Sequence, residues 1–232
     1  MNLLALDTST PRAAVALAVG PALHVGDPEA TDGGRHGRQL LPRVKALLRA
    51  AGLRPGDLDA LAVGLGPGSY TGLRVGLTAA KTLAFALGKP LIGLDSFAAI
   101  ARNAPGDAES ILGVADAQRG DAYLTEFAPA GSGLPPVALG PIRLVSLAEW
   151  APTLPPGAWV LGPGLDRLRV DWPAHARLGG LDRGHPAPGH LIALGLEGFR
   201  AGQFADPATL EPRYIRRSAA EDQWATNRPG PR

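Results

Sequence analysis

A glycine-rich turn is the part of the sequence best suited to chemistry. Residues 66–72 read Gly-Pro-Gly-Ser-Tyr-Thr-Gly and lie between an apolar run, 61–65, and a run with helical spacing that ends near Leu87. Such a strand-to-helix turn directs backbone N–H groups and the positive end of the helix dipole at one place, where an anion or a partner's backbone can bind. The glycines could equally serve only a tight turn. Both interpretations stay open, whereas the glycine spacing excludes a Walker A loop and a dinucleotide fingerprint.

The histidines and the serine of this loop do not form a catalytic or metal-binding pattern. None of the five histidines pairs with another at the i, i+4 spacing of a helix, so a metal site is not expected. Ser69 lacks the Gly-x-Ser-x-Gly setting of a nucleophile elbow and is expected to cap the following helix. Because the chain has no cysteine, a thiol nucleophile is excluded. The sequence therefore assigns no catalytic residue and no metal ligand.

The elements that must position this loop repeat along the chain. The strand–Asp–turn–strand pattern around Asp7 recurs around Asp116, and Val-Leu-Gly-Pro-Gly at 160–164 echoes the glycine loop. Two echoes in the same order favour two copies of one α/β unit. We expect an N-terminal lobe at 1–104, a C-terminal lobe at 105–217 and a flexible tail at 218–232. The expected elements of the first lobe are strands at 3–6, 13–19, 24–27, 61–65 and 91–94, and helices from 40, from 70 and from 96.

Two of the expected helices carry faces that could meet another helix. The helix from Leu40 to Ala51 is amphipathic, with Pro42 either in its first turn or at a kink. In the helix from Tyr70, small residues recur every four positions and form a ridge that would allow close packing. These residues are Gly72, Gly76, Ala80 and Ala84. From the residues alone, the ridge could face a partner or the protein's own sheet.

Composition narrows the class of protein. The 232-residue chain carries a net charge of +2, and the arginine-rich segment 211–232 accounts for it. The charges of the remaining residues cancel, which is not typical of a protein that binds nucleic acid strongly by itself. No apolar run is long enough for a membrane span, and the N-terminal residues lack the basic region of a signal peptide. We therefore expect a cytoplasmic protein without a membrane partner.

Five motifs of the chain belong together. They are Leu6-Asp7-Thr8-Ser9-Thr10, His36 ahead of Leu40-Leu41-Pro42, the loop with its continuation Leu-Arg-Val-Gly, Val114-Ala115-Asp116-Ala117, and the closing Glu211-Pro212-Arg213-Tyr214-Ile215-Arg216. This set resembles the TsaB family, also called YeaZ, of the bacterial tRNA threonylcarbamoyladenosine machinery, most specifically from Leu3 to about Gly120. The resemblance implies a two-lobed α/β protein with the duplicated actin/hexokinase/Hsp70-like (ribonuclease H-like) fold.

The superfold implied by this resemblance suggests candidate binding residues. Its members use the aspartates that end the first strand of each half to orient metal and phosphate, which makes Asp7 and Asp116 candidates. Either carboxylate could instead cap its own turn. The candidate nucleotide or anion loop comprises Asp7, Thr8, Ser9, Gly66, Gly68, Ser69, Tyr70 and Thr71. No firmly bound cofactor is expected, and ATP or ADP would bind near a partner interface.

The resemblance also implies partners. In TsaB proteins the two N-terminal helices pair with the catalytic subunit TsaD, or with a second TsaB copy when TsaD is absent. The ATPase TsaE is the other expected partner, and tRNA would be bound only through the complex. The expected interface residues are His36, Leu40, Leu41, Val44, Leu47, Leu73, Gly76, Leu77 and Ala80.

The expected function is a non-catalytic dimerisation and activating subunit. Its complex would transfer threonylcarbamoyl from the adenylate to N6 of adenosine 37 in tRNA. Two alternatives belong to other classes: an ATP-dependent small-molecule kinase of the same superfold, using Asp7 and the glycine loop, and a glycopeptidase-like hydrolase. The second half offers no clear adenosine-binding glycine pair for the kinase, and the hydrolase would need the His-x-x-x-His motif that TsaD has and this chain lacks.

Overall fold

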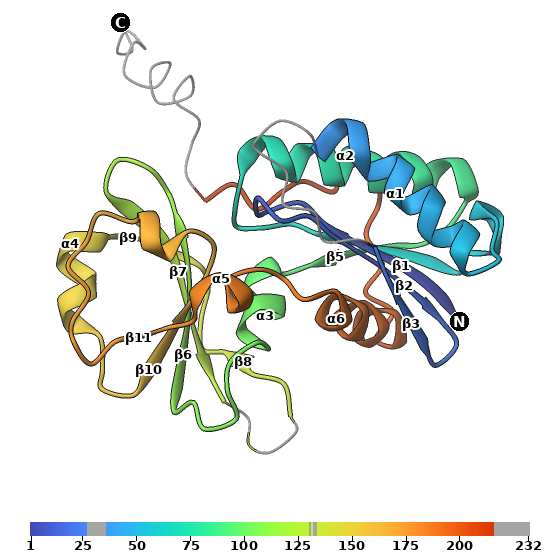
Figure 1. The fold of residues 1–232 in the computed structure, drawn as a ribbon. Coiled ribbons are helices and arrows are strands. Elements are labelled where there is room, and N and C mark those ends of the chain that lie inside the picture. The colour runs from blue at the N-terminus through green and yellow to red at the C-terminus, as the bar shows by residue number, and fades with distance from the viewer. Residues whose placement is uncertain (27–35, 130, 132–133, 216–232) are drawn as a thin grey trace, which may run out of the picture.

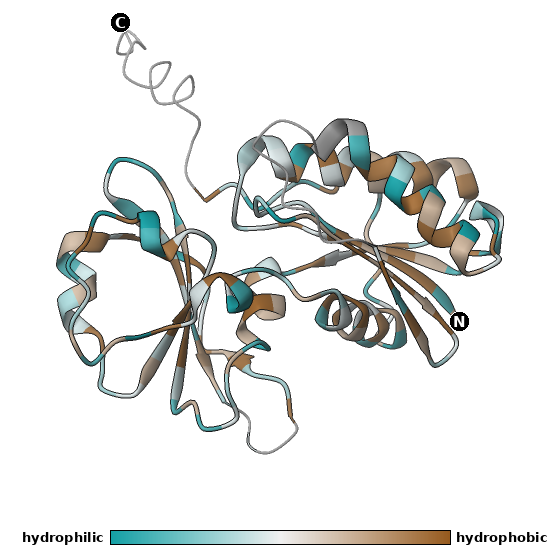
Figure 2. Ribbon diagram, viewed as in Figure 1, coloured by the Kyte–Doolittle hydropathy of each residue, from teal (hydrophilic) through white to brown (hydrophobic). Residues whose placement is uncertain are grey.

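Two β-sheets flanked by helices lie side by side in the computed structural model of the chain (Figure 1). The structure describes residues 1–26, 36–129, 131 and 134–215, without the side chains of residues 36–38. Asp27, the last residue of the expected third strand, and the expected tail at 218–232 lie outside the described residues. The central strands of both sheets are largely hydrophobic (Figure 2), as expected for strands covered on both faces.

The first sheet contains five strands in the order β3-β2-β1-β4-β5. β1 runs antiparallel to β2 and parallel to β4. The strands are β1 (Asn2–Asp7), β2 (Ala14–Val19), β3 (Ala22–Val25), β4 (Ala60–Gly64) and β5 (Leu91–Leu94). Helices α1 (His36–Ala50) and α2 (Tyr70–Leu87) pack on one face, where Leu4, Leu61 and Leu77 join one core cluster.

The second sheet repeats this plan. β6 runs antiparallel to β7 and parallel to β10, as β1 does to β2 and β4. The strands are β6 (Ser110–Asp116), β7 (Asp121–Ala128), β8 (Val137–Ala138), β9 (Arg143–Ser146), β10 (Ala158–Leu161) and β11 (Arg177–Leu178). The short helices around it are α4 (Leu147–Trp150), α5 (Gly180–Arg183) and 3₁₀ turns at Ala151–Thr153 and Leu165–Arg167. A further 3₁₀ turn, Pro55–Asp57, precedes β4 in the first half. The predicted duplication is thus visible in the strand topology.

Each half lends a helix to the other half's sheet. Phe97 and Ile100 of α3 (Ser96–Ala101) pack with Ile111 of the second sheet. Leu191 of α6 (Pro188–Arg200) packs with Leu3 on the face of the first sheet opposite α1 and α2 (Figure 1). The packing therefore crosses the expected boundary at residue 104, because the apolar face of each sheet is covered by a helix from the other half.

The ends of α2 follow from its sequence. Ser69 caps the N-terminus by accepting a hydrogen bond from the backbone N–H of Gly72 at 3.2 Å, as predicted. Gly88 ends the helix in the left-handed conformation that glycine adopts most easily. α1 begins at His36 and not at Leu40, so Pro42 lies inside this helix. Within the ranges that the structure describes, no helix has the length and hydropathy needed to cross a membrane.

Candidate docking groove and glycine loop

Asp7 ends β1 as a buried carboxylate with only 1% of its surface exposed. Its Oδ1 accepts hydrogen bonds from the backbone N–H of Ser9 at 2.8 Å and from the Ser9 hydroxyl at 2.6 Å. Its Oδ2 accepts one from the Ser96 hydroxyl at 2.7 Å. Burial raises the pKa of Asp7, and the serine hydrogen bonds offset part of that rise. Asp7 thus links β1 to the start of α3 and is closed off from a metal ion or phosphate.

The glycine loop packs directly on the turn that follows Asp7. A Cβ on Gly68 would lie 2.2 Å from the carbonyl oxygen of Ser9, and one on Gly72 would lie 2.0 Å from that of Thr8. The Thr8 hydroxyl donates a hydrogen bond to the Gly72 carbonyl at 2.6 Å. Any side chain at these glycines would push α2 away from β1, so close approach explains the glycines.

The backbone N–H groups of this loop are largely used inside the protein. The N–H of Gly66 donates to the Ser96 hydroxyl at 3.1 Å, and that of Ser69 donates to the Ser9 carbonyl at 2.7 Å. The Gly72 N–H is taken by the Ser69 cap. Three of the donors that an anion would need are therefore already bonded, which favours the tight-turn interpretation. Tyr70 and Thr71, at the start of α2, remain exposed.

Asp116 occupies the corresponding end of β6 and is exposed. Its carboxylate accepts hydrogen bonds from the backbone N–H of Gln118 at 2.7 Å and from the Gln118 side chain at 2.9 Å. Asp7 and Asp116 both hold the turn after their own strand, which is the structural role considered for them. Among the described residues, no three His, Asp or Glu side chains come together in a way that could hold a metal ion.

The small-residue ridge of α2 faces the protein's own sheet. Gly72, Gly76, Ala80 and Ala84 are all buried. A Cβ on Gly76 would lie 2.2 Å from the Thr8 hydroxyl oxygen. Gly76 and Ala80 were predicted to contact a partner helix. The structure corrects this, because the ridge is the surface that lets α2 approach β1 closely.

The apolar residues predicted for the interface are mostly core residues. Leu40, Val44, Leu47, Leu73 and Leu77 are between 2% and 6% exposed. They fail as surface contacts because the apolar stripe of each amphipathic helix turns toward the sheet.

Leu41 differs from this core set, since half of its surface is exposed. The side chain of His36 lies outside the described residues. Among the described members of the predicted set, Leu41 therefore offers a partner the most exposed side chain.

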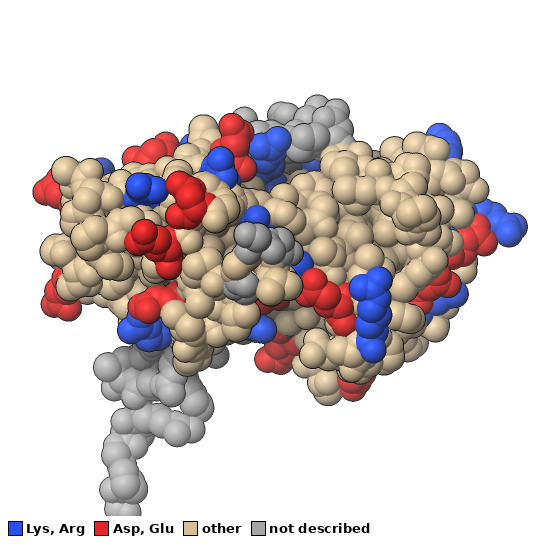
Figure 3. All heavy atoms as spheres, turned by 90° about the horizontal axis from the view of Figure 1, so that it is seen from below, with Lys and Arg blue, Asp and Glu red and all other residues tan. Residues whose placement is uncertain are grey.

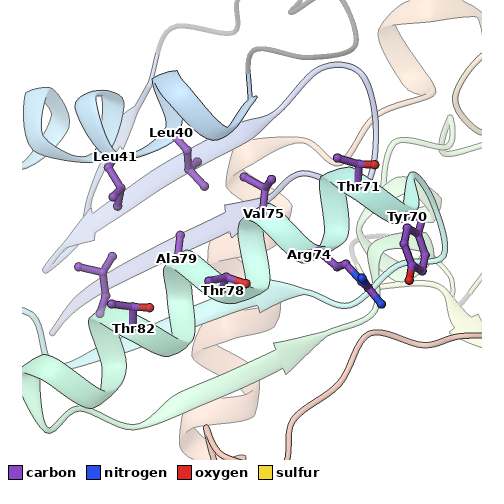
Figure 4. A pocket seen from close by; sticks show the side chains of 10 residues that line it. Leu40, Leu41, Tyr70, Thr71, Arg74, Val75, Thr78, Ala79 and Thr82 are labelled. Atoms are coloured by element: carbon purple, nitrogen blue, oxygen red, sulfur yellow. The ribbon is translucent and has the colours of Figure 1, made fainter.

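The opposite face of α2 forms a groove with α1 (Figure 4). It has a volume of about 620 Å³, and we call it the α1–α2 groove. Its lining is mostly aliphatic and threonine side chains, with a tyrosine and an arginine at one end. The lining residues are Leu40, Leu41, Tyr70, Thr71, Arg74, Val75, Thr78, Ala79, Thr82 and Leu83. A second hollow of about 500 Å³, beside α1, shares Leu41 and Leu83 with it.

Arg74 and Tyr214, at one end of the groove, had no predicted role. Arg74 Nε donates a hydrogen bond to the Tyr214 hydroxyl at 3.0 Å, although 140 residues separate them. The Tyr70 ring lies 5.5 Å from the Tyr214 ring. Tyr214 belongs to the closing segment that supported the family resemblance. Nothing in the pattern of that segment predicts that it lies beside the groove.

Comparisons with known proteins agree with this architecture. A family model described as TsaD, tRNA N6-adenosine threonylcarbamoyltransferase, matches residues 28–139. The tRNA threonylcarbamoyladenosine biosynthesis protein TsaB of Bacillus subtilis is 30% identical over 196 residues, which cover 82% of this chain and 83% of that protein. The tRNA N6-adenosine threonylcarbamoyltransferase of Sorangium cellulosum is 50% identical over 60 residues, 26% of this chain and 17% of that protein.

The solved structure of YeaZ from Pseudomonas aeruginosa superposes with a TM-score of 0.78 at 26% identity, over 92% of this chain and 99% of that one. That likeness extends over both sheets. It confirms the expected duplicated actin-like α/β fold.

Proposed function

Because this chain belongs to the TsaB (YeaZ) family of tRNA threonylcarbamoyladenosine biosynthesis proteins, we propose that it is the dimerisation and activating subunit of a complex with TsaD. The complex transfers threonylcarbamoyl from its adenylate to N6 of adenosine 37 in tRNA, and TsaD carries the catalytic residues. The observation that supports this role is the α1–α2 groove, a recess of about 620 Å³ with a mostly apolar lining.

The groove has the character of a helix-docking surface. Leu41, Val75, Ala79 and Leu83 supply an apolar floor that no described segment covers. Contiguous exposed apolar surface on a soluble protein marks a place where another molecule binds. The short side chains of Thr78 and Ala79 keep the middle of α2 low, so a partner helix could approach closely.

The likeness of the first lobe to TsaD supports the choice of partner. The TsaD family model matches residues 28–139, a range that includes both α1 and α2. Two related lobes can pair through equivalent faces about a pseudo-twofold axis, as the two copies of a symmetric dimer do. By the same geometry, a second copy of this chain would occupy the groove when TsaD is absent. TsaE would join this assembly at another surface.

We place nucleotide and tRNA binding at the complex level. Asp7 is buried and three of the loop N–H groups are bonded internally, so ATP or ADP would bind only where the chain meets its partner. On the face in Figure 3, acidic and basic side chains are interspersed, without a continuous basic patch. With a net charge of +2, the chain would contact tRNA only within the complex.

The two alternative functions gain no support from the site. A kinase that used Asp7 to orient Mg²⁺ and phosphate would need that carboxylate open to solvent, and it is buried. A metal-dependent hydrolase would need a cluster of ligands, and the described part of the chain offers none.

Binding to purified TsaD from the same organism tests the proposed function. Thr78→Arg places a long cation in the middle of the groove, at an exposed position, so the free variant should melt like the wild type while its Kd for TsaD rises about 30-fold or more. Ala46→Arg is the matched control, because Ala46 is exposed on α1 but does not line the groove. Equal binding of TsaD by both variants and the wild type would show that the partner docks elsewhere.

A further inference from the structure

One end of the α1–α2 groove is occupied by an exposed cluster of three side chains, Tyr70, Arg74 and Tyr214. The Arg74 guanidinium carbon lies 4.1 Å from the centre of the Tyr70 ring and 5.9 Å from that of Tyr214. Tyr70 and Tyr214 are 48% and 44% exposed. Figure 4 shows the side chains of Tyr70 and Arg74 together at this end of the groove. A partner that lies in the groove must therefore meet this cluster.

The guanidinium of Arg74 is held in one orientation. Its face stacks on Tyr70 and its Nε donates to the Tyr214 hydroxyl at 3.0 Å, which leaves the edge with the two Nη atoms for another contact. The hydrogen bond that Arg74 donates to the Tyr214 hydroxyl raises the pKa of Arg74, whose guanidinium is cationic at all ordinary pH values. Throughout the described ranges, no carboxylate lies within ion-pair distance of Arg74.

Unlike Arg74, Arg213, which precedes Tyr214 in the chain, has an acidic partner. Arg213 forms an ion pair with Asp95, and its backbone N–H donates to the Leu65 carbonyl at 2.9 Å. Lys81 of α2 donates from Nζ to the Leu210 carbonyl at 3.0 Å. These contacts hold residues 210–213 beside α2 and β4 and thereby position Tyr214. These contacts thus anchor Tyr214, while the cation that it orients has no acidic partner among the described residues.

We propose that Arg74 is a specificity-determining residue of the docking groove: it receives a carboxylate from an Asp or Glu on the partner's docking helix, and Tyr214 is its positioning residue. The inference rests on the proposed function and deepens it. A planar guanidinium whose two Nη atoms bond no described residue matches a carboxylate in a two-pronged contact. A partner that covered the apolar floor without supplying an anion would strip water from an unpaired cation, which is costly. The cluster therefore selects for a partner with an acid at this position.

A double-mutant cycle with TsaD tests the carboxylate. Arg74→Gln keeps a polar, though shorter, side chain and removes the charge, and we expect Kd to rise about tenfold or more. Each exposed Asp and Glu on the TsaD helices is then changed to Asn or Gln. One of these variants should lose most of its effect on Kd when it is combined with Arg74→Gln. Arg200→Gln on α6 is the matched control for loss of one positive charge and should bind as the wild type does.

Tyr214→Phe tests the positioning role. It removes the hydroxyl and keeps the ring, so Kd should rise several-fold in the wild-type background and should not change in the Arg74→Gln background. A general structural effect of the substitution would appear equally in both backgrounds. Equal effects would therefore refute the positioning role.

The outcomes also separate this inference from the proposed function. If Thr78→Arg blocks TsaD binding while Arg74→Gln leaves Kd unchanged, the groove docks the partner and the carboxylate contact is wrong. If Arg74→Gln changes the affinity of the complex for ADP but not the Kd for TsaD, the anion is a nucleotide phosphate and the inference is likewise overturned. If Thr78→Arg has no effect either, the proposed docking surface itself fails.

Discussion

Gly72→Ala should destabilise the protein even though alanine is the better helix former. The new Cβ would lie 2.0 Å from the Thr8 carbonyl oxygen, a backbone atom that cannot rotate away. To relieve the clash, the start of α2 must move off the turn after β1, and the hydrogen bond from the Thr8 hydroxyl to the Gly72 carbonyl lengthens. Overpacking of this kind costs about 1–3 kcal/mol.

The helix propensity of alanine acts in the opposite direction. Replacing glycine by alanine in a helix interior gains up to about 1 kcal/mol. Gly72 lies in the first turn of α2, where this gain is smaller, so the clash outweighs it and the net loss is about 1–2 kcal/mol. For a chain of this size, each kcal/mol lowers Tm by about 2–4 °C, so we expect Tm to fall by about 2–8 °C.

Thermal unfolding followed by circular dichroism, with urea unfolding for the free energy, measures this change. Gly189→Ala is the matched control, because a Cβ at this first-turn position of α6 would meet only the Leu23 Cδ2 atom at 3.5 Å, an ordinary contact. The control should be as stable as the wild type or slightly more so. A Gly72→Ala protein at least as stable as the wild type would refute the argument that close approach to Thr8 requires this glycine.

Three further substitutions test the buried ridge of α2, the cap at its N-terminus and the buried carboxylate of Asp7. Ala80→Arg buries an unpaired cation at a position with 0% exposure, so the free chain should melt early or aggregate; normal melting would put the small-residue ridge on the surface. Ser69→Ala removes the cap on α2 and should cost about 1 kcal/mol, with Thr71→Ala as the exposed control; equal Tm values for both would argue against the cap. For Asp7, burial raises the pKa above 3.8, so its stabilising contribution is complete below pH 3.8 and is lost as pH rises through the folded-state pKa. Urea unfolding should therefore show wild type losing stability relative to Asp7→Asn as pH rises; a constant gap would contradict the raised pKa.

The local structure of the first lobe could be predicted because its signals are short-range. Ser69 precedes the helix that it caps by one residue, and Gly88 ends that helix. The repeated strand–Asp–turn pattern at Asp7 and Asp116 predicted the duplicated topology, because each pattern can be recognised from neighbouring residues alone. The resemblance of these motifs to one family then gave the fold.

The direction in which α2 faces could not be predicted from its sequence. A ridge such as Gly76 and Ala80 suits close packing against a sheet or against a helix equally well. The choice between sheet and helix depends on the space at Gly76, where a Cβ would lie 2.2 Å from the Thr8 hydroxyl oxygen. Thr8 follows β1, so the sequence of α2 alone does not contain this information. The exposed face, with Thr78 and Arg74, is identified only once the buried one is known.

Long-range packing was also beyond the sequence pattern. A helix from Ser96 was expected, whereas α6 was not, and no local pattern says that each covers the sheet of the other half. Arg74 and Tyr214 are 140 residues apart, and their hydrogen bond depends on the path of the closing segment. The part that Arg74 and Tyr214 play in the proposed docking surface was therefore not predicted.

The most direct test of the docking role is threonylcarbamoyladenosine formation in purified tRNA, with the threonylcarbamoyl adenylate as donor and TsaD and TsaE from the same organism. We expect no product from this chain alone and product once it is combined with TsaD and TsaE. In the mixture with TsaD and TsaE, Thr78→Arg should abolish product formation, while Ala46→Arg should form product as the wild type does. Product from the chain without TsaD, or full stimulation by a folded Thr78→Arg protein, would contradict the account.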